Sequence, residues 1–196
     1  MNTVARFLSR PAISIVLRKI VELNFFMQKR FIRRFLLPLA GNDRILDIGC
    51  GTGEFSPFFP REQYTGLDID LVNIAYARAH YDREFILGNA TSLPFPDRSF
   101  TKALVVGVFH HLDDQNAQKM MSEIIRAVRP GGTMLVIEDT KNDFPLTKLM
   151  HAMDQGAHIR TVAQWKDFFS RQARVEAFRT FRSGVCYYSL FLLKHG

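Results

Sequence analysis

Short apolar runs alternate with amphipathic stretches along most of this chain. Seven runs have the length and composition of strands, and they span residues 44–48, 63–68, 85–90, 103–107, 133–138, 176–181 and 186–193. Helices are expected between them, at residues 54–59, 70–80, 114–129 and 163–172. The alternation of strands with helices predicts a parallel sheet that is covered by helices on both faces.

The first 40 residues follow a different pattern, in which bulky apolar residues are mixed with basic ones. Residues 1–37 carry eight basic side chains and one acid, Glu22, and therefore the whole formal net charge of +7. Arg18 and Lys19 interrupt the apolar run, which is too short for a membrane span, and no signal-peptide cleavage pattern is clear. The pattern predicts a basic amphipathic helical arm over residues 1–40, followed by one domain over residues 41–196. The helical part of the arm is expected to end before Pro38.

This arm has two main interpretations. It can be a packed helix that covers a functional site, with its apolar residues facing the core and its basic residues in water. It can also be an interfacial helix that contacts an anionic membrane through residues 1–37, where each basic residue contributes roughly 1 kcal/mol. Nucleic acid is a disfavoured third partner, because no recognition module is visible.

Length and cysteine usage limit the class of protein. A chain of 196 residues can bury a single sizeable core. Cys50 and Cys186 are not spaced as a metal pair or as a disulfide framework, so a reducing cytoplasm is expected, with a peripheral membrane location as an option. A weak metal-like spacing is interrupted by Gly156, and we expect no metal there; its members are His151, Asp154 and His158.

A glycine-rich turn directly follows the first strand of the sheet. Gly49, Gly51 and Gly53 alternate there, and such glycines let a backbone approach a ligand closely. The spacing is G-x-G-x-G, whereas the usual dinucleotide fingerprint is G-x-G-x-x-G. Asp47 precedes the turn, and its carboxylate would repel a pyrophosphate but suits a ligand with a cationic end. The turn therefore predicts a nucleoside-type cofactor with a positive charge.

Polar residues also follow the second and fourth strands. Asp68 ends the second strand about twenty residues after the glycines, where dinucleotide folds place a carboxylate for ribose hydroxyls. His110 and His111 follow the fourth strand, at the edge where open α/β sheets bind ligands. His111 is the preferred candidate for a catalytic base and His110 the lesser one, although one of them can simply pack in the structure.

Further motifs occur in a fixed order along the chain. Residues 93–100 read LPFPDRSF, residues 109–112 read FHHL, and residues 125–132 read IRAVRPGG before the fifth strand. Together with the glycine turn and Asp68, these motifs resemble the class I S-adenosylmethionine-dependent methyltransferases. The resemblance covers roughly residues 44–139 and is to the methyltransferase type 11, or ubiquinone-biosynthesis-like, group of small-molecule methyltransferases.

The resemblance implies a Rossmann-like, doubly wound α/β fold. Its seven strands are expected in the order 3-2-1-4-5-7-6, with strand 7 antiparallel and helices on both faces. It also implies that the protein binds S-adenosylmethionine and releases S-adenosylhomocysteine, with no metal. The positions implied to bind the cofactor are Asp47, Gly49, Cys50, Gly51, Gly53, Asp68, Ile69, Asn89, Ala90 and Val106.

Two positions depart from the resembled pattern. Asn89 replaces the commoner Asp, and its amide oxygen can still accept a hydrogen bond from the adenine amino group. Thr101 and Lys102 replace the usual Asp after Phe100, a change that we interpret as structural because it lies at a strand start.

The prediction is a methyltransferase that acts by in-line displacement on a small acceptor, which can be hydrophobic or membrane-associated. Residues 141–172 are expected to form a lid over this acceptor. The alternative is a non-catalytic S-adenosylmethionine-binding module that the basic arm recruits to membranes. A nicotinamide-dependent oxidoreductase is disfavoured by Asp47 and by the glycine spacing. The sequence leaves the acceptor and the oligomeric state open.

Overall fold

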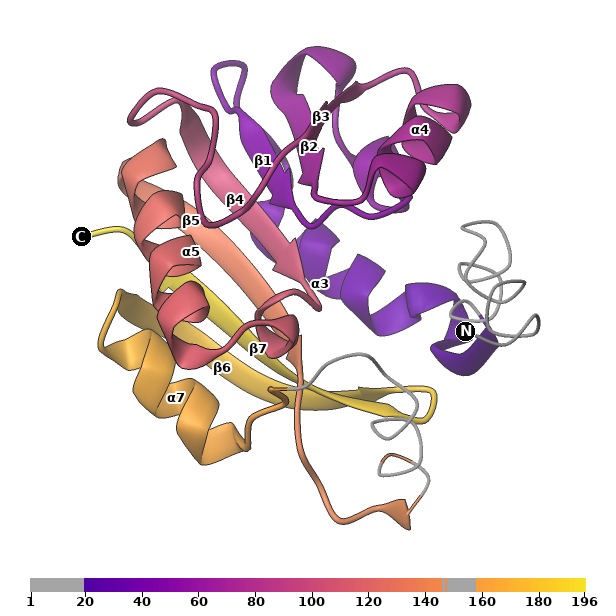
Figure 1. The fold of residues 1–196 in the computed structure, drawn as a ribbon, viewed down its shortest axis with the longest axis vertical. Coiled ribbons are helices and arrows are strands. Elements are labelled where there is room, and N and C mark those ends of the chain that lie inside the picture. Colours follow the sequence, from indigo (N-terminus) through magenta and orange to yellow (C-terminus); the bar gives the residue numbers. More distant parts are fainter. Residues whose placement is uncertain (1–19, 146, 148–157) are drawn as a thin grey trace.

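The computed structural model describes residues 20–145, 147 and 158–196, and its centre is one seven-stranded sheet (Figure 1). The strand order is β3-β2-β1-β4-β5-β7-β6, and β7 runs antiparallel to both of its neighbours. This confirms the order expected from the resemblance. The strands are β1 (Ile45–Ile48), β2 (Tyr64–Asp68), β3 (Glu84–Leu87), β4 (Phe100–Val106), β5 (Val128–Asp139), β6 (Arg174–Ser183) and β7 (Cys186–Lys194).

Helices cover both faces of this sheet and bury two apolar clusters against it. Helices α5 (Asp114–Ala127) and α7 (Val162–Ser170) pack on one face, while α3 (Phe26–Leu36) and α4 (Leu71–His80) pack on the other (Figure 1). Helices α4, α5 and α7 each begin at a polar cap, which satisfies N–H groups that have no partner within the helix. The caps are Asp70 for α4, Asp113 for α5 and Thr161 for α7.

The described part of the basic arm is built into the core. Helix α3 ends before Pro38 as predicted, and its buried residues include Phe31, Ile32 and Leu36. These side chains share an apolar cluster with residues of β1, β5 and β7, so residues 25–36 belong to the same packed unit as the sheet. None of the described helices is long and apolar enough to cross a membrane. The opposite face of α3 exposes three basic residues, Arg30, Arg33 and Arg34.

A buried acid fastens the start of this arm to the sheet. The Glu22 side chain is 3% exposed, and its Oε2 accepts hydrogen bonds from Gln28 Nε2 at 2.8 Å and from the Tyr188 hydroxyl at 2.6 Å. The Ser183 hydroxyl donates to the Glu22 carbonyl oxygen at 2.7 Å. Since Ser183 and Tyr188 flank the turn between β6 and β7, the one acid of the arm serves to dock it.

The expected helix at residues 54–59 is wrong. The structure has only a short 3-10 helix there, η2 (Ser56–Phe58), and the chain is extended at Phe59. Pro60 explains the difference, because a proline disfavours helical backbone in the residue before it. The glycine turn is therefore not followed by an α-helix N-terminus.

The expected lid over residues 141–172 is too long at its C-terminal end. Helix α7 lies within that range, but Trp165 and Phe169 are fully buried in the core cluster against the sheet. This helix is part of the packed layer because its apolar stripe has the sheet as its partner. Residues 141–160 are what is left for a lid, and of these 146 and 148–157 lie outside the described residues.

Candidate functional site

The predicted site residues meet at the carboxyl edge of the parallel strands. Ile48 at the end of β1 pairs with Leu67 in β2 and with Val105 in β4, and Val106 pairs with Ile137 in β5. The segments at the carboxyl ends of these strands therefore lie next to one another along the same edge of the sheet. They are residues 49–53, 68–70, 107–111 and 138–140.

The glycine turn has a backbone that other residues adopt only with strain. Gly49, Gly51 and Gly53 have φ values of 71°, 53° and 80°. A Cβ on Gly49 would lie 2.3 Å from Cγ2 of Val108, whereas a Cβ on Gly51 would meet no protein atom within 4 Å. Gly49 is thus needed for packing, while Gly51 faces open space of the kind that a close-lying cofactor fills.

The turn uses its own amides internally. The N–H groups of Gly49 and Cys50 donate to the Leu67 carbonyl oxygen at 2.7 and 3.0 Å. The Gly51 N–H donates to Asp68 Oδ2 at 2.8 Å. These donors are therefore not directed at a phosphate, which agrees with the prediction of a cofactor other than a dinucleotide.

Asp68 links this turn to the start of α4. Its Oδ1 accepts from the Asp70 N–H at 2.8 Å, so both carboxylate oxygens hold backbone amides in place. The residue is buried, with 8% of its surface exposed, and each carboxylate oxygen has a further lone pair. The next residue, Ile69, is 72% exposed, as a side chain that covers one face of a base would be.

Asp47 lies beneath the turn. It is 1% exposed, and its Oδ2 accepts a hydrogen bond from the Tyr64 hydroxyl at 2.7 Å. Burial raises the pKa of Asp47 to about 7 from its ordinary 3.8, with the Tyr64 bond acting in the opposite direction. Burial and the nearby Asp47 also raise the pKa of the Cys50 thiol, which stays neutral. Both residues thus support the turn from inside.

The remaining predicted cofactor positions lie along β3 and β4. Asn89 is exposed, and its Oδ1 accepts from the N–H and the hydroxyl of Thr91, both at 2.9 Å. This local turn orients the Asn89 side chain, and its contact with adenine stays a prediction. Ala90 is half-buried against the core, and Val106 is half-buried at the end of β4.

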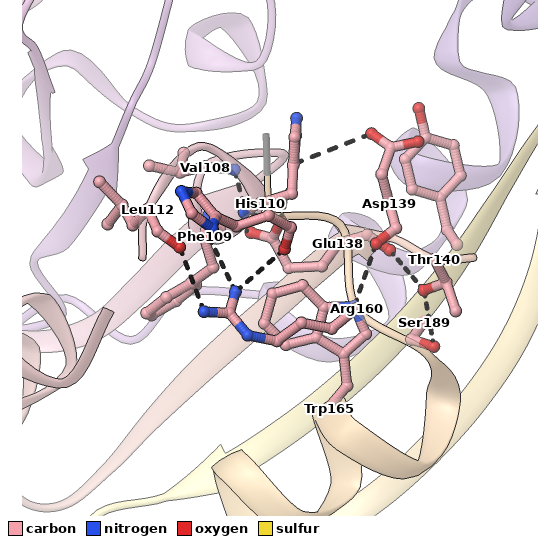
Figure 2. A network of polar contacts seen from close by, with 12 residues as sticks. Val108, Phe109, His110, Leu112, Glu138, Asp139, Thr140, Arg160, Trp165 and Ser189 are labelled. Atoms are coloured by element: carbon pink, nitrogen blue, oxygen red, sulfur yellow. Dashed lines mark hydrogen bonds and ion pairs between the residues drawn. The ribbon is translucent and has the colours of Figure 1, made fainter. Parts of the chain in front are cut away.

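His110 is held in the interior by Glu138 (Figure 2). Its ring is 4% exposed, and Nδ1 lies 3.0 Å from Glu138 Oε2 and 4.0 Å from Asp139 Oδ2. Glu138 is fully buried and also accepts the backbone N–H groups of Val108, Phe109 and His110, at 3.0, 3.0 and 3.3 Å. One carboxylate therefore shapes the whole segment that follows β4.

Arg160 supports the same segment from the far end of the expected lid (Figure 2). Its guanidinium donates to the carbonyl oxygens of Phe109 at 3.2 Å and Leu112 at 3.1 Å, and to Asp114 Oδ1 at 2.7 Å. The hydrogen bond and the charge of Arg160 lower the pKa of Asp114. Sequence reasoning missed Glu138 and Arg160. The available signal for Glu138 was an acid at the carboxyl end of a buried strand.

His111, the preferred catalytic candidate, is exposed next to this network. Its ring centroid lies 4.1 Å from that of His110, so the two rings stack at a tilt. Of the residues with metal-like spacing, His151 and Asp154 lie outside the described residues. Within the described part of the chain, no group of three or more His, Cys, Asp or Glu side chains could hold a metal.

Comparisons with known proteins agree on one kind of domain. Residues 46–136 match the family model described as a methyltransferase domain. The chain is 30% identical to a fatty-acid O-methyltransferase of Mycolicibacterium smegmatis, over 64% of this chain and 47% of that protein. It is 26% identical to the ubiquinone/menaquinone biosynthesis C-methyltransferase UbiE of Desulfotalea psychrophila, over 82% of this chain and 75% of that protein.

The fold is also found among solved structures. A crystal structure of an S-adenosylmethionine-dependent methyltransferase from Methanosarcina mazei superposes with a TM-score of 0.68 at 22% identity, covering 84% of this chain and 96% of that one. This likeness concerns the fold alone. The chain spans between 26% and 48% of the length of the first four curated relatives that it matches.

Proposed function

The chain belongs to the class I S-adenosylmethionine-dependent methyltransferases, and we propose that it transfers a methyl group from this cofactor to a small acceptor. The observation that carries the proposal is the open space at Gly51, framed by Asp68 and the exposed Ile69 at the carboxyl edge. When bound, S-adenosylmethionine supplies a methyl group already activated by a sulfonium.

The reaction that we propose is an in-line displacement. A lone pair on the acceptor forms a bond to the methyl carbon while the carbon–sulfur bond breaks, and its electron pair stays on the sulfur of S-adenosylhomocysteine. The protein then has to align the acceptor and exclude water, and such placement can lower a barrier by up to roughly 7–11 kcal/mol.

In this proposal five of the predicted cofactor residues have a role that their positions allow. Asp68 accepts from the ribose hydroxyls, Ile69 lies against the adenine, and Asn89 with Ala90 borders the base. Asp47 acts from beneath the turn, where its contact with Tyr64 keeps the strand end in place.

Replacement of Gly51 tests the cofactor site. A valine there is forced to φ near 53° and projects into the open space, so S-adenosylmethionine binding in calorimetry should be lost. Gly131→Val is a matched control, since Gly131 also has a positive φ of 74° and an open Cβ position but lies in β5, between the paired residues Val128 and Thr133. Equal loss of binding in both variants would leave only a folding defect.

His111 is our proposed acceptor-side residue. It is exposed, whereas His110 has its ring buried against Glu138 and is the weaker candidate. A base is needed only if the acceptor loses a proton, as a phenol or an ammonium does. His111→Ala should then lower turnover and leave cofactor affinity within a few-fold. Unchanged turnover with a protonated acceptor would remove His111 from the mechanism.

The acceptor that we propose is a small hydrophobic molecule. Two relatives support this choice, since one is named for fatty acids and another for ubiquinone and menaquinone biosynthesis. Transfer of a labelled methyl group to a panel of such acceptors tests it, and it also separates an enzyme from a non-catalytic cofactor-binding module. A protein that binds the cofactor but labels no acceptor would favour the module.

We also propose that the basic arm makes a peripheral contact with anionic membranes. Ile20, Leu23 and Phe26 are 68%, 65% and 62% exposed, close in sequence to the basic face of α3. Exposed apolar residues beside basic ones are typical of interfacial helices. Co-sedimentation with vesicles that contain anionic lipid should fall with added salt, because salt screens surface charges over about 8–10 Å. Salt-independent sedimentation, or none, would leave α3 as a packed cover.

A further inference from the structure

A groove on the outer face of α3 combines cations with exposed apolar side chains. Its volume is about 580 Å³, within the range of roughly 300–1,000 Å³ that is usual for small-molecule sites. The residues that matter for its chemistry are Leu23, Phe26, Lys29, Arg30, Arg33 and Arg34.

We propose that this groove binds the head group of a phosphorylated amphiphile, with its apolar part against Leu23 and Phe26. The inference deepens the proposed function, because this amphiphile would be the class of acceptor that the enzyme methylates. The ligand that we propose is a single molecule, because the lining residues form a groove of molecular size.

Apart from Lys29, which pairs with Glu54, the positive charges of the groove have no protein counter-charge in the described part of the chain. Arg30, Arg33 and Arg34 are exposed, and no described acidic residue forms an ion pair with them. Residues 1–19 contain four basic and no acidic side chains, so this segment cannot neutralise the groove. Several unneutralised cations favour a doubly charged phosphate over a singly charged carboxylate, and guanidinium groups match phosphate geometry.

Two of these arginines are held in place by aromatic rings. The guanidinium of Arg33 lies 4.8 Å from the ring centroid of Phe58, and that of Arg34 lies 5.6 Å from the centroid of Phe35. Such stacking lowers the conformational freedom that a long side chain loses on binding an anion. The groove is therefore partly pre-organised.

The groove lies beside the cofactor turn. Lys29, which lines the groove, contacts Glu54 Oε1 through its Nζ at 2.9 Å. Beneath the groove, the ring of the buried Phe25 lies 5.7 Å from that of Phe55. Glu54 and Phe55 directly follow Gly53, so one wall of the groove touches the segment that begins at the glycines. An amphiphile anchored here by its phosphate can direct its other end toward the carboxyl edge of the sheet.

Calorimetry with decyl phosphate, kept below its micelle concentration and without vesicles, tests the site. We expect saturable binding to the full-length protein and at least a tenfold loss in the triple variant Arg30→Gln, Arg33→Gln, Arg34→Gln. A matched triple variant removes the same charge elsewhere and should bind within about twofold of wild type: Lys119→Gln, Arg129→Gln, Arg171→Gln. Equal losses in both variants would show a general charge effect and overturn the site.

The two parts of the ligand are tested separately. Uncharged decyl glucoside and singly charged decanoate should bind at least tenfold more weakly than decyl phosphate. Phe26→Ser should weaken decyl phosphate at least threefold but leave inorganic phosphate unchanged. Tight binding of decanoate would overturn the preference for phosphate. Binding to anionic vesicles without binding of decyl phosphate would assign the face to a membrane surface instead.

Cofactor titrations on the same samples separate this inference from the proposed function. The groove variant should bind S-adenosylmethionine like wild type, because its arginines lie outside the glycine turn. A wild-type protein that binds decyl phosphate but no S-adenosylmethionine would contradict the proposed function and leave the groove standing. The reverse result would remove the groove alone.

Discussion

The two halves of the carboxyl edge are held in shape by different kinds of contact. In the cofactor half, between β1 and β2, glycine conformations and backbone N–H donors dominate, and the bond from the Gly51 N–H to the Asp68 carboxylate spans 17 residues. In the acceptor half, beyond β4, side chains that are distant in sequence do this work. Glu138 reaches back 28–30 residues to the segment after β4, and Arg160 reaches back 51 residues to Phe109.

This difference shows why the glycine turn can be recognised from its own residues, whereas Glu138 and Arg160 cannot. A turn that needs positive φ restricts its own residues to glycine, so its sequence reveals it. A buried carboxylate such as Glu138 can be satisfied by any N–H groups that the fold brings near, and its own residue type does not name them.

The largest expected loss of stability comes from a substitution in the acceptor half, at Glu138. Glu138→Ala leaves two buried N–H groups, one part-buried N–H group and the His110 ring without their acceptor, and should destabilise the protein by about 3–5 kcal/mol. Urea unfolding measures it, with exposed-strand Glu176→Ala as a control near 0.5 kcal/mol or less, roughly the scale of surface changes. A loss below about 1 kcal/mol would mean that the segment after β4 supports itself.

In the cofactor half, Asp68→Ala should act mainly on the ligand. We expect S-adenosylmethionine to bind about 1.5–3 kcal/mol more weakly, the rough scale of hydrogen bonds to a charged group. Asp70→Ala is the neighbouring control, because Asp70 caps α4 through the Val72 N–H and should affect stability instead. Calorimetry that finds wild-type affinity in a folded Asp68→Ala protein would refute the ribose role.

The buried Asp47 predicts that the stability of the protein depends on pH. Its pKa is raised from 3.8 to about 7, so the folded state retains a proton that the unfolded state loses. Stability from this group is present at low pH and is lost as pH rises toward and through 7, by about 2 kcal/mol between roughly pH 5.5 and 8. Asp47→Asn should remove that slope from urea unfolding curves. An unchanged slope in the variant would assign the pH dependence to other groups.

The smallest expected effect concerns the link between the arm and the cofactor turn. The Lys29–Glu54 pair has side chains 20% and 12% exposed, and Lys29→Met should cost less than about 1 kcal/mol. Arg61→Met, which breaks the more exposed pair with Asp82, is the control and should cost less still. A loss well above 1 kcal/mol would show that this pair docks the arm.

Local patterns in the sequence were enough to predict the order of strands and helices, the glycine turn and the position of Asp68. These depend on local properties: apolar periodicity, the positive φ of a turn, and the end of a strand. The same local reasoning failed at residues 54–59, although Pro60 was a signal against a helix. The substitution at Thr101 and Lys102 was interpreted correctly as structural, since both side chains contact Asp43 at the start of the sheet.

The partners of the polar residues, by contrast, are known only from the folded structure. It placed Glu138 under His110, Arg160 under the segment after β4, and α3 in the core with its arginines around a groove. None of these follows from spacing, because an amphipathic helix or a buried acid can be satisfied by many surfaces of the right polarity. The surface that such a helix or acid contacts depends on how the other helices cover the sheet. This arrangement forms only when segments that are distant in sequence pack together.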